Sequence, residues 1–176
     1  TRKESSAASD VYKRQPHHLA TELLRERTGL TLTHVPYKGA APALQDILGG
    51  NVAFMLVDTA SGNPFVKSGK LHALGVASAQ RVPSLPDVPT LIEQGVTGYE
   101  AYAWQGLAVP AATPPQTLAR LSQGLTEALQ SDAVKARFEA LGVDGLSGTP
   151  DDMARYVKAE RERWGKLIRD NNIRID

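Results

Sequence analysis

Residues 32–58, which decide the fold, read LTHVPYKGAAPALQDILGGNVAFMLVD. The pattern predicts a strand, a turn at Gly39, a helix, a stop at Gly49 and a second strand. Gly39 permits a sharp turn, and the first N–H groups of the helix that follows point toward the mouth of that turn. An anion can bind at such a helix start without a dedicated Lys or Arg side chain. Function is therefore expected where the strands end.

The same alternation of strands and helices continues on both sides of this stretch. We expect strands over 32–36, 51–57 and 71–77, and helices from residue 16 to Gly29, over 41–48 and near 64–68. This rhythm is typical of the α/β class with a parallel sheet. A Pro-rich passage over 81–90 then predicts a crossover or hinge. A short helix over 90–94 and an extended segment over 99–109 follow it.

The C-terminal third predicts helices that pack against other elements and carry no chemistry. Thr113 offers an N-cap hydroxyl, with Pro114 at the first helical position and Gln116 three residues on. Thr149 and Pro150 again provide an N-cap hydroxyl and a Pro at the first helical position, before a second amphipathic helix. A shorter helical stripe lies between these two and ends at Gly142.

Composition removes several classes of function. The chain of 176 residues has 20 Lys and Arg against 19 Asp and Glu, so no basic field exists to hold nucleic acid. The absence of Cys removes disulfides, thiolate catalysis and Cys-based metal sites. Apolar runs are shorter than the roughly 18 to 20 residues that a membrane-spanning helix needs. The length suits one ordinary domain or the larger part of a two-lobed one.

Catalytic, metal and cofactor motifs are not found. No His pair has the helical spacing of a zinc site with a nearby Glu. Ser61 lacks the G-x-S-x-G context of a nucleophile, and the chain has no G-x-G-x-x-G or Walker loop. We expect no metal, no cofactor and no enzyme activity. His18 is interpreted as a buried imidazole that braces a turn, in preference to a ligand contact.

Three positions leave a structural and a functional interpretation open. Asp58 and Thr59 form a good helix N-cap pair, and Asp58 can also line a cleft at the carboxyl end of a parallel sheet. Lys38 is a solvated charge or a group that attracts an anionic ligand. Trp104 is a core residue or the wall of a cleft.

At this point the residues resemble a known family. The ordered strings that carry the resemblance are HLATEL (18–23), VPYKG (35–39), LGGNV (48–52), LPDVPT (85–90), GYE (98–100), WQG (104–106) and VP (109–110). From about Pro16 to Asp176 the chain resembles the Bug (TctC-like) family, the extracytoplasmic solute-binding proteins of tripartite tricarboxylate transporters.

The resemblance implies a fold and a function. Family members are α/β periplasmic binding proteins of type II, whose two lobes close over a small carboxylate. The implied ligand is a di- or tricarboxylate, an amino acid or an aromatic acid. The implied protein is a periplasmic monomer without a cofactor that delivers its ligand to membrane permease subunits. Two alternatives stay open at the sequence level: the effector-binding domain of a transcription regulator and an α/β enzyme.

The chain also departs from the family pattern. The family's signal peptide, its P-x-x-G-G loop and its G-x-G-T loop before the His-bearing helix are not found in this sequence. We therefore predict an N-terminally truncated fragment whose residues 1–15 are a non-native or disordered tail. Residues 16–78 would form the nearly complete second, ligand-binding lobe, 79–98 the crossover or hinge, and 99–176 the mostly helical C-terminal part of the first lobe.

The resemblance also implies which residues contact the ligand. The expected set comprises the turn after the first strand, the loop after the second strand and one aromatic residue from the returning segment: Tyr37, Lys38, Gly39, Ala40, Asp58, Thr59, Ala60, Ser61 and Trp104. Gly39 and Ala40 would donate N–H groups to a ligand carboxylate. Asp58, because it repels a carboxylate, would accept from a ligand hydroxyl or amino group or brace its loop. His18 would be a structural residue near the cleft.

Overall fold

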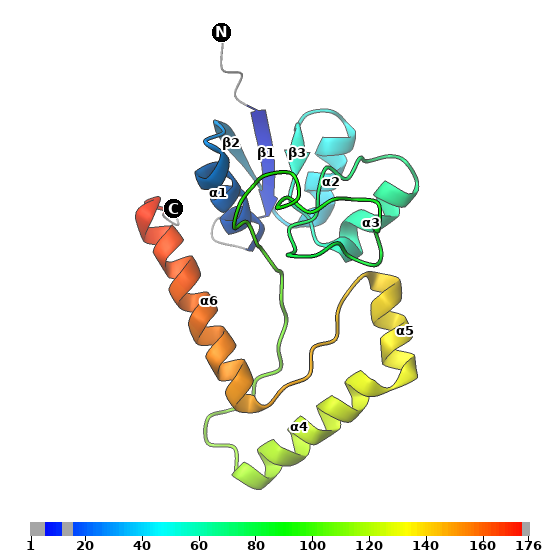
Figure 1. Ribbon diagram of the computed structural model, residues 1–176, viewed down its shortest axis with the longest axis vertical. Coiled ribbons are helices and arrows are strands. Elements are labelled where there is room, and N and C mark those ends of the chain that lie inside the picture. Colours follow the sequence, from blue (N-terminus) through cyan, green and yellow to red (C-terminus); the bar gives the residue numbers. More distant parts are fainter. Residues whose placement is uncertain (1–5, 12–15, 174–176) are drawn as a thin grey trace.

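The computed structural model describes residues 6–11 and 16–173 of the chain. The elements within these residues are β1 (Ser6–Val11), α1 (Pro16–Thr28), β2 (Leu32–Tyr37), α2 (Ala40–Leu48), β3 (Phe54–Met55), α3 (Thr59–Lys67), α4 (Pro115–Gln130), α5 (Asp132–Leu141) and α6 (Pro150–Asp170). Figure 1 shows an α/β unit made from β1 to α3 and an open arm made from α4, α5 and the first part of α6. The predicted α/β class with a parallel sheet is confirmed.

The sheet has the order β2-β1-β3, and both pairings are parallel. Ser6 pairs with Leu32 at one end of β1, and Val11 pairs with Tyr37 at the other. Residues 1–15 were predicted to be a non-native or disordered tail, but residues 6–11 form the central strand, so the disordered alternative does not hold for them. The sequence SAASDV has no pattern that predicts a strand. A central strand can nevertheless form from such a sequence, because backbone hydrogen bonds to both neighbours hold it whatever its side chains are. Residues 1–5 and 12–15 lie outside the described part of the chain.

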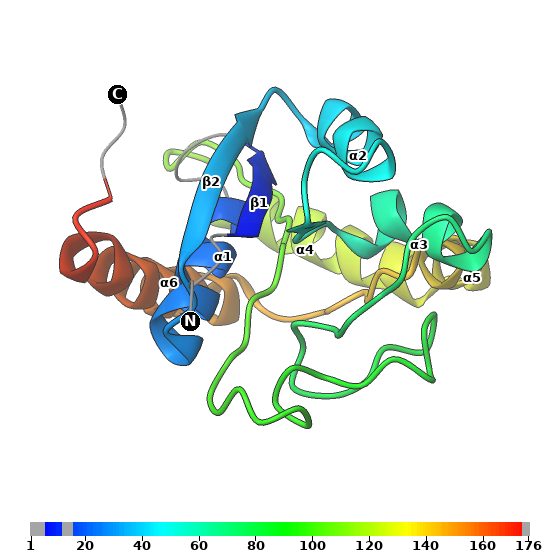
Figure 2. The ribbon, with the colours of Figure 1, turned by 90° about the horizontal axis from the view of Figure 1, so that it is seen from above.

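The crossovers between the parallel strands place helices on both faces of this sheet (Figure 2). The chain passes from β1 through α1 to β2 on one side, and then through α2 back across β1 to β3 on the other. Because the direction reverses, α1 and α2 cover opposite faces. Figure 2 shows α1 on the side of α6, and α2 on the side of α3.

Two predicted strands differ from the structure. The strand expected over 51–57 is reduced to Phe54–Met55. The strand expected over 71–77 is wrong, because this segment makes only a parallel bridge between Val76 and Thr90. The Val76 N–H donates to the Pro89 carbonyl at 2.9 Å, and the bridge cannot extend through Pro89, which has no N–H of its own.

The predicted helix starts are correct at one end of the arm and wrong at the other. Thr149 caps α6 in a capping box, in which the Asp152 N–H donates to Thr149 Oγ1 at 3.1 Å and the Thr149 N–H donates to the Asp152 carboxylate. Thr113 does not cap α4, because its N–H donates to the Pro110 carbonyl in a turn and the helix begins at Pro115. The helix expected over 90–94 is a turn, which Gly95 ends at φ 93°.

The core joins α1 to the end of α6. Its buried side chains are Leu19, Leu23, Tyr99, Leu167 and Ile173. The Tyr99 hydroxyl donates to the Ala20 carbonyl at 3.0 Å, so residue 99 is fixed to α1 by packing and by a hydrogen bond. Both ends of the 99–173 segment therefore reach the α/β unit, whereas its middle forms the open arm (Figure 1).

The arm exposes much apolar surface. No residue of α4 or α5 is buried. Large apolar side chains of this arm and of the segments that flank it are exposed, among them Leu107, Leu121, Leu125, Leu146 and Val157. An open groove of about 810 Å³ runs between α4 and residues 147–152. Large contiguous apolar patches on a soluble domain are typical of surfaces that another element covers.

Candidate functional site

The carboxyl edge of the sheet gathers three helix starts. Because β1, β2 and β3 are parallel, α1, α2 and α3 all begin beyond the same edge. From the central strand β1 the chain first adds β2 on one side, and it later adds β3 on the other side. The direction in which strands are added therefore reverses between β1 and β3. Ligands of open α/β sheets bind in the crevice outside such a reversal point.

The start of α2 exposes backbone donors. Gly39 is its N-cap residue, with φ 111° and ψ 171°, and no side chain caps the helix. A side chain is strained at this φ, although a Cβ at Gly39 would meet nothing within 4 Å. Pro42 has no N–H, so the first-turn donors of α2 are the N–H groups of Ala40 and Ala41.

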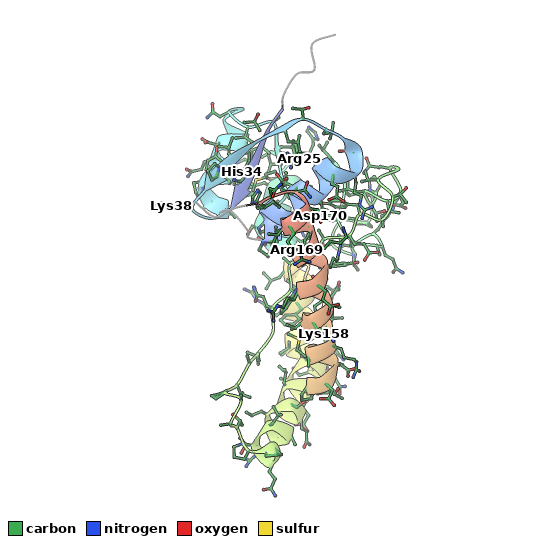
Figure 3. The ribbon with its side chains drawn as sticks, turned by 90° about the vertical axis from the view of Figure 1, so that its left-hand side faces the viewer. Arg25, His34, Lys38, Lys158, Arg169 and Asp170 are labelled. Carbon is green, nitrogen blue, oxygen red and sulfur yellow. The ribbon has the colours of Figure 1, made fainter. Side chains whose placement is uncertain are left out.

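Of the two side chains before Gly39, Tyr37 is held by a hydrogen bond and Lys38 is exposed to solvent. The Tyr37 hydroxyl donates to Asp46 Oδ2 at 2.6 Å, which ties the end of β2 to α2. That hydrogen bond is the main cause of a raised pKa for the Tyr37 hydroxyl. Lys38 is exposed, and Figure 3 shows it at the margin of the α/β unit, away from the helical arm. Tyr37 therefore fixes the turn, and Lys38 is free to add positive charge near it.

The start of α3 is capped by its own carboxylate. Asp58 is the N-cap residue, and its Oδ1 accepts a 2.8 Å hydrogen bond from the Ser61 N–H. Thr59 Oγ1 donates to the Gly142 carbonyl at 2.7 Å. The first-turn N–H groups of Thr59 and Ala60 are the donors that the Asp58 side chain does not use. Both interpretations of Asp58 remain compatible with this geometry, since a cap at the sheet edge also lines that edge.

His17 lies beside this start and is not among the site residues that the sequence predicts. Its imidazole is mostly buried, and the negative charge of Asp58 is close enough to act on it. Burial lowers the pKa of His17, and Asp58 offsets only part of that effect. Sequence spacing gives no sign of this proximity, because Asp58 belongs to a different β-α unit.

His18 is the next residue of the same helical turn. It is buried, and its ring stacks on His34 of β2 with 4.3 Å between centroids. Its Nε2 lies 3.8 Å from Glu22 Oε1. The burial expected for His18 is present, and these contacts fix α1 against the sheet.

Trp104 makes its ring contact in the arm. Its indole meets Tyr156 of α6 edge to face at 5.5 Å. A Cβ at Gly106 would lie against Met153, so the segment 104–106 runs along the start of α6. The recorded contacts of Trp104 are therefore with α6 and not with the starts of α2 and α3, and its place in a cleft wall stays a prediction.

The described residues provide neither a cluster of metal-ligating side chains nor a membrane-spanning helix. Within residues 6–11 and 16–173, no three or more His, Asp or Glu side chains are grouped so that they could hold a metal ion. Over the same ranges, no helix combines the length and apolar character needed to cross a membrane.

The fold and the sheet edge define a lobe of an α/β periplasmic binding protein. Three solved structures share the fold. The R. palustris protein Rpa4515 with adipate is 32% identical, with a TM-score of 0.86 over 97% of this chain and 58% of that one. Periplasmic binding protein BugD is 31% identical, with a TM-score of 0.81 over 96% and 57%. MatC from Rhodopseudomonas palustris with bound malate is 29% identical, with a TM-score of 0.79 over 94% and 57%.

The chain belongs to the tripartite tricarboxylate transporter family of receptors, TctC, whose family model matches residues 9–173. The resemblance to the Bug (TctC-like) family is confirmed. The matched family and the neighbours of known structure are solute-binding receptors and not enzymes. This agrees with the prediction that the chain is not an enzyme. The chain spans about half the length of the first curated relatives it matches, 45% and 48% for two of them.

Proposed function

We propose that this chain forms a ligand-binding lobe of an extracytoplasmic receptor for a small carboxylate. The observation that carries the proposal is the uncapped start of α2 at the carboxyl edge of the sheet, in a family with neighbours solved with adipate and malate. Backbone N–H groups at a helix start bind a carboxylate without a charged side chain.

The geometry favours a ligand with two polar ends. The starts of α2 and α3 follow β2 and β3, which lie two strands apart, so they are separated by roughly 10 Å at normal strand spacing. Ala40 and Ala41 offer N–H groups at one start, and Lys38 adds positive charge nearby. At the other start, Asp58 repels a second carboxylate and attracts a hydroxyl or amino group.

Capture requires no chemical step. The ligand carboxylate replaces its water shell with fixed backbone donors, and a second lobe closes over it. Among the residues proposed to line the site, Tyr37 positions the turn through Asp46, and Thr59 positions the start of α3 through Gly142. Gly39, Ala40 and Ala60 contribute backbone, the Ser61 N–H holds the Asp58 carboxylate in place, and Lys38 and Asp58 contribute charge.

The partners and the compartment are proposed by analogy with the same family. A receptor of a tripartite transporter works outside the cytoplasm, and it presents its ligand to membrane permease subunits. The periplasmic neighbours of known structure support this location. The receptor is proposed to act as a monomer.

We also propose that the helical arm belongs to the other lobe of the receptor. Residues 16–78 would be the ligand-binding lobe, 79–98 the crossover, and 99–176 the helical part of the first lobe. The exposed leucines of α4, the groove beside it and the greater length of the relatives support this division. In the full-length receptors, the remaining part of the chain would cover this apolar surface.

Isothermal titration calorimetry with adipate and malate tests the proposal. A receptor lobe binds at least one of them with a stoichiometry near one, and it leaves the acid chemically unchanged. Absence of heat with both acids and with a panel of amino-acid and aromatic carboxylates would overturn the proposal for this chain.

A further inference from the structure

We propose that residues 102–109 are a strand that lacks its sheet, and that strands from the remainder of the receptor pair with it. The remainder is the part of the longer relatives that lies outside their match with this chain. The inference rests on the proposed function and deepens it, because it names the surface through which the two parts of the receptor associate. Figure 1 shows the segment as a long trace that leads from the α/β unit to α4.

The sequence of this segment is typical of a buried strand. Residues 102–109 read YAWQGLAV, in which no side chain is charged and Gln105 is the only amide. A strand with one face in water alternates apolar and polar residues. A short run that is apolar on both faces is instead typical of a strand inside a sheet that is covered on both sides.

The structure leaves the backbone of this segment unpaired. Within residues 6–11 and 16–173, no main-chain N–H or C=O group of 102–109 forms a hydrogen bond. The flanks are fixed, since the Ala101 N–H donates to the Ala77 carbonyl and the Thr113 N–H donates to the Pro110 carbonyl. All residues from 102 to 109 are exposed. Both edges of the segment are therefore open to another strand.

The two faces of the segment differ. Side chains of an extended chain alternate between opposite faces. On one face, Trp104 packs on Tyr156 of α6 with 5.5 Å between ring centroids, and a Cβ at Gly106 would meet Met153 of the same helix. On the other face, Leu107 is 78% exposed. A strand with a helix on one face and an open second face matches one strand of a layered α/β sheet whose other elements are missing.

The remainder of the receptor fits these open edges better than a second copy of this chain. This chain covers 45% and 48% of the length of two curated relatives, so the remainder is about as long as the chain itself. A second copy would add one strand and leave the other edge open. The remainder is long enough to provide a strand at each edge and a cover for Leu107. Main-chain hydrogen bonds would join the parts, and apolar side chains would fill the faces.

Hydrogen–deuterium exchange followed by mass spectrometry tests the proposal on two whole proteins. One is this chain, and the other is BugT of Bordetella pertussis, which is 35% identical over 158 residues that cover 90% of this chain. Amides of 102–109 should exchange as fast as those of an unstructured peptide. Amides of the matching BugT segment should exchange at least about 100-fold more slowly, because paired strands exchange only after local unfolding. The amides of α1, which has buried residues, should be slow in both proteins and serve as the control.

A proline substitution gives a second measurement. Gln105→Pro removes an N–H that has no acceptor within the described part of this chain, so the urea midpoint of this chain should stay unchanged. Proline at the matching residue of BugT should lower the urea midpoint, because it removes a hydrogen bond between strands. A lowered midpoint in this chain, or an unchanged midpoint in BugT, would overturn the proposal.

The exchange data separate the other possible partners. Fast exchange in the matching segment of BugT would overturn the pairing outright. Slow exchange of 102–109 in this chain at every concentration would place the partner within the chain, and protection that appears only at high concentration would make a second copy the partner. Calorimetry with adipate and malate tests the proposed function separately. Binding of either acid together with fast exchange in BugT would leave that function standing and overturn only the strand pairing.

Discussion

Thr59 Oγ1 donates a 2.7 Å hydrogen bond to the Gly142 carbonyl and so ties the start of α3 to the end of α5 across 83 residues of sequence. The contact joins the proposed ligand-binding edge to the helical arm. If the arm moves against the α/β unit, this hydrogen bond must either break or move together with both partners.

Removal of the Thr59 hydroxyl should loosen that tie. Thr59→Val keeps the shape of the side chain and leaves the Gly142 carbonyl without its donor, which should lower the free energy of unfolding by about 1–2 kcal/mol. Thr59→Ser keeps the hydroxyl and should recover most of the loss. Urea denaturation followed by circular dichroism measures both variants, and equal stability of the Val and Ser variants would contradict the assigned role.

A Cβ at Gly142 should also be destabilising. Gly142 has φ 65°, and a Cβ there would lie 2.8 Å from Ser84 Oγ and 3.1 Å from Asn63 Nδ2. Gly142→Ala should therefore lower the free energy of unfolding by about 1–2 kcal/mol. Gly124→Ala is the control with opposite sign, because Gly124 is within α4 with no atom near its Cβ, and it should add about 0.5–1 kcal/mol. The same urea titrations distinguish the two signs.

The pH dependence of stability should carry a contribution from His17. Burial lowers its pKa in the folded chain below the unfolded value of 6.5, so the folded chain binds fewer protons than the unfolded chain. This contribution is fully present above pH 6.5 and is lost as the pH falls through the lowered pKa. Denaturation midpoints between pH 7.5 and 5 should therefore fall more in the unsubstituted chain than in His17→Asn; parallel profiles would contradict the burial of a neutral imidazole.

The apolar face of α4 should be dispensable for folding of the α/β unit. Leu121 and Leu125 are 51% and 40% exposed, and α4 has no buried residue. A double change to Gln should reduce the binding of a hydrophobic dye and raise solubility, with unfolding free energy changed by less than about 0.5 kcal/mol. A cooperative loss of stability would show that these leucines already pack within this chain.

Helix and turn chemistry could be predicted where one local rule decides the conformation. Gly39 and Gly49 bracket α2, Asp58 caps α3, and Thr149 closes a capping box, because each of these depends on neighbours close in sequence. The strand β1 could not be predicted, because its polar residues have no apolar alternation and its conformation depends on two partners distant in the chain.

The candidate site also combines features that the local sequence predicts with features that depend on distant parts of the chain. The backbone donors after Gly39 follow from the sequence, because a helix start provides them wherever it occurs. The proximity of His17 to Asp58 depends on the order of the strands, which brings the starts of α1 and α3 together. Trp104 was selected by resemblance, but its ring contact is with Tyr156, since the segment that carries it runs along α6.

The central claim is that the turn at Gly39 binds a carboxylate through its backbone, and calorimetry of a matched pair of variants tests it most directly. Gly39→Val and Gly69→Val place the same β-branched side chain at positive φ, 111° and 71°, and each Cβ meets nothing within 4 Å. Only Gly39 belongs to the proposed site, so Gly39→Val should weaken the binding of adipate or malate at least about tenfold while Gly69→Val leaves it unchanged. Equal affinity in both variants and the unsubstituted chain would contradict the account.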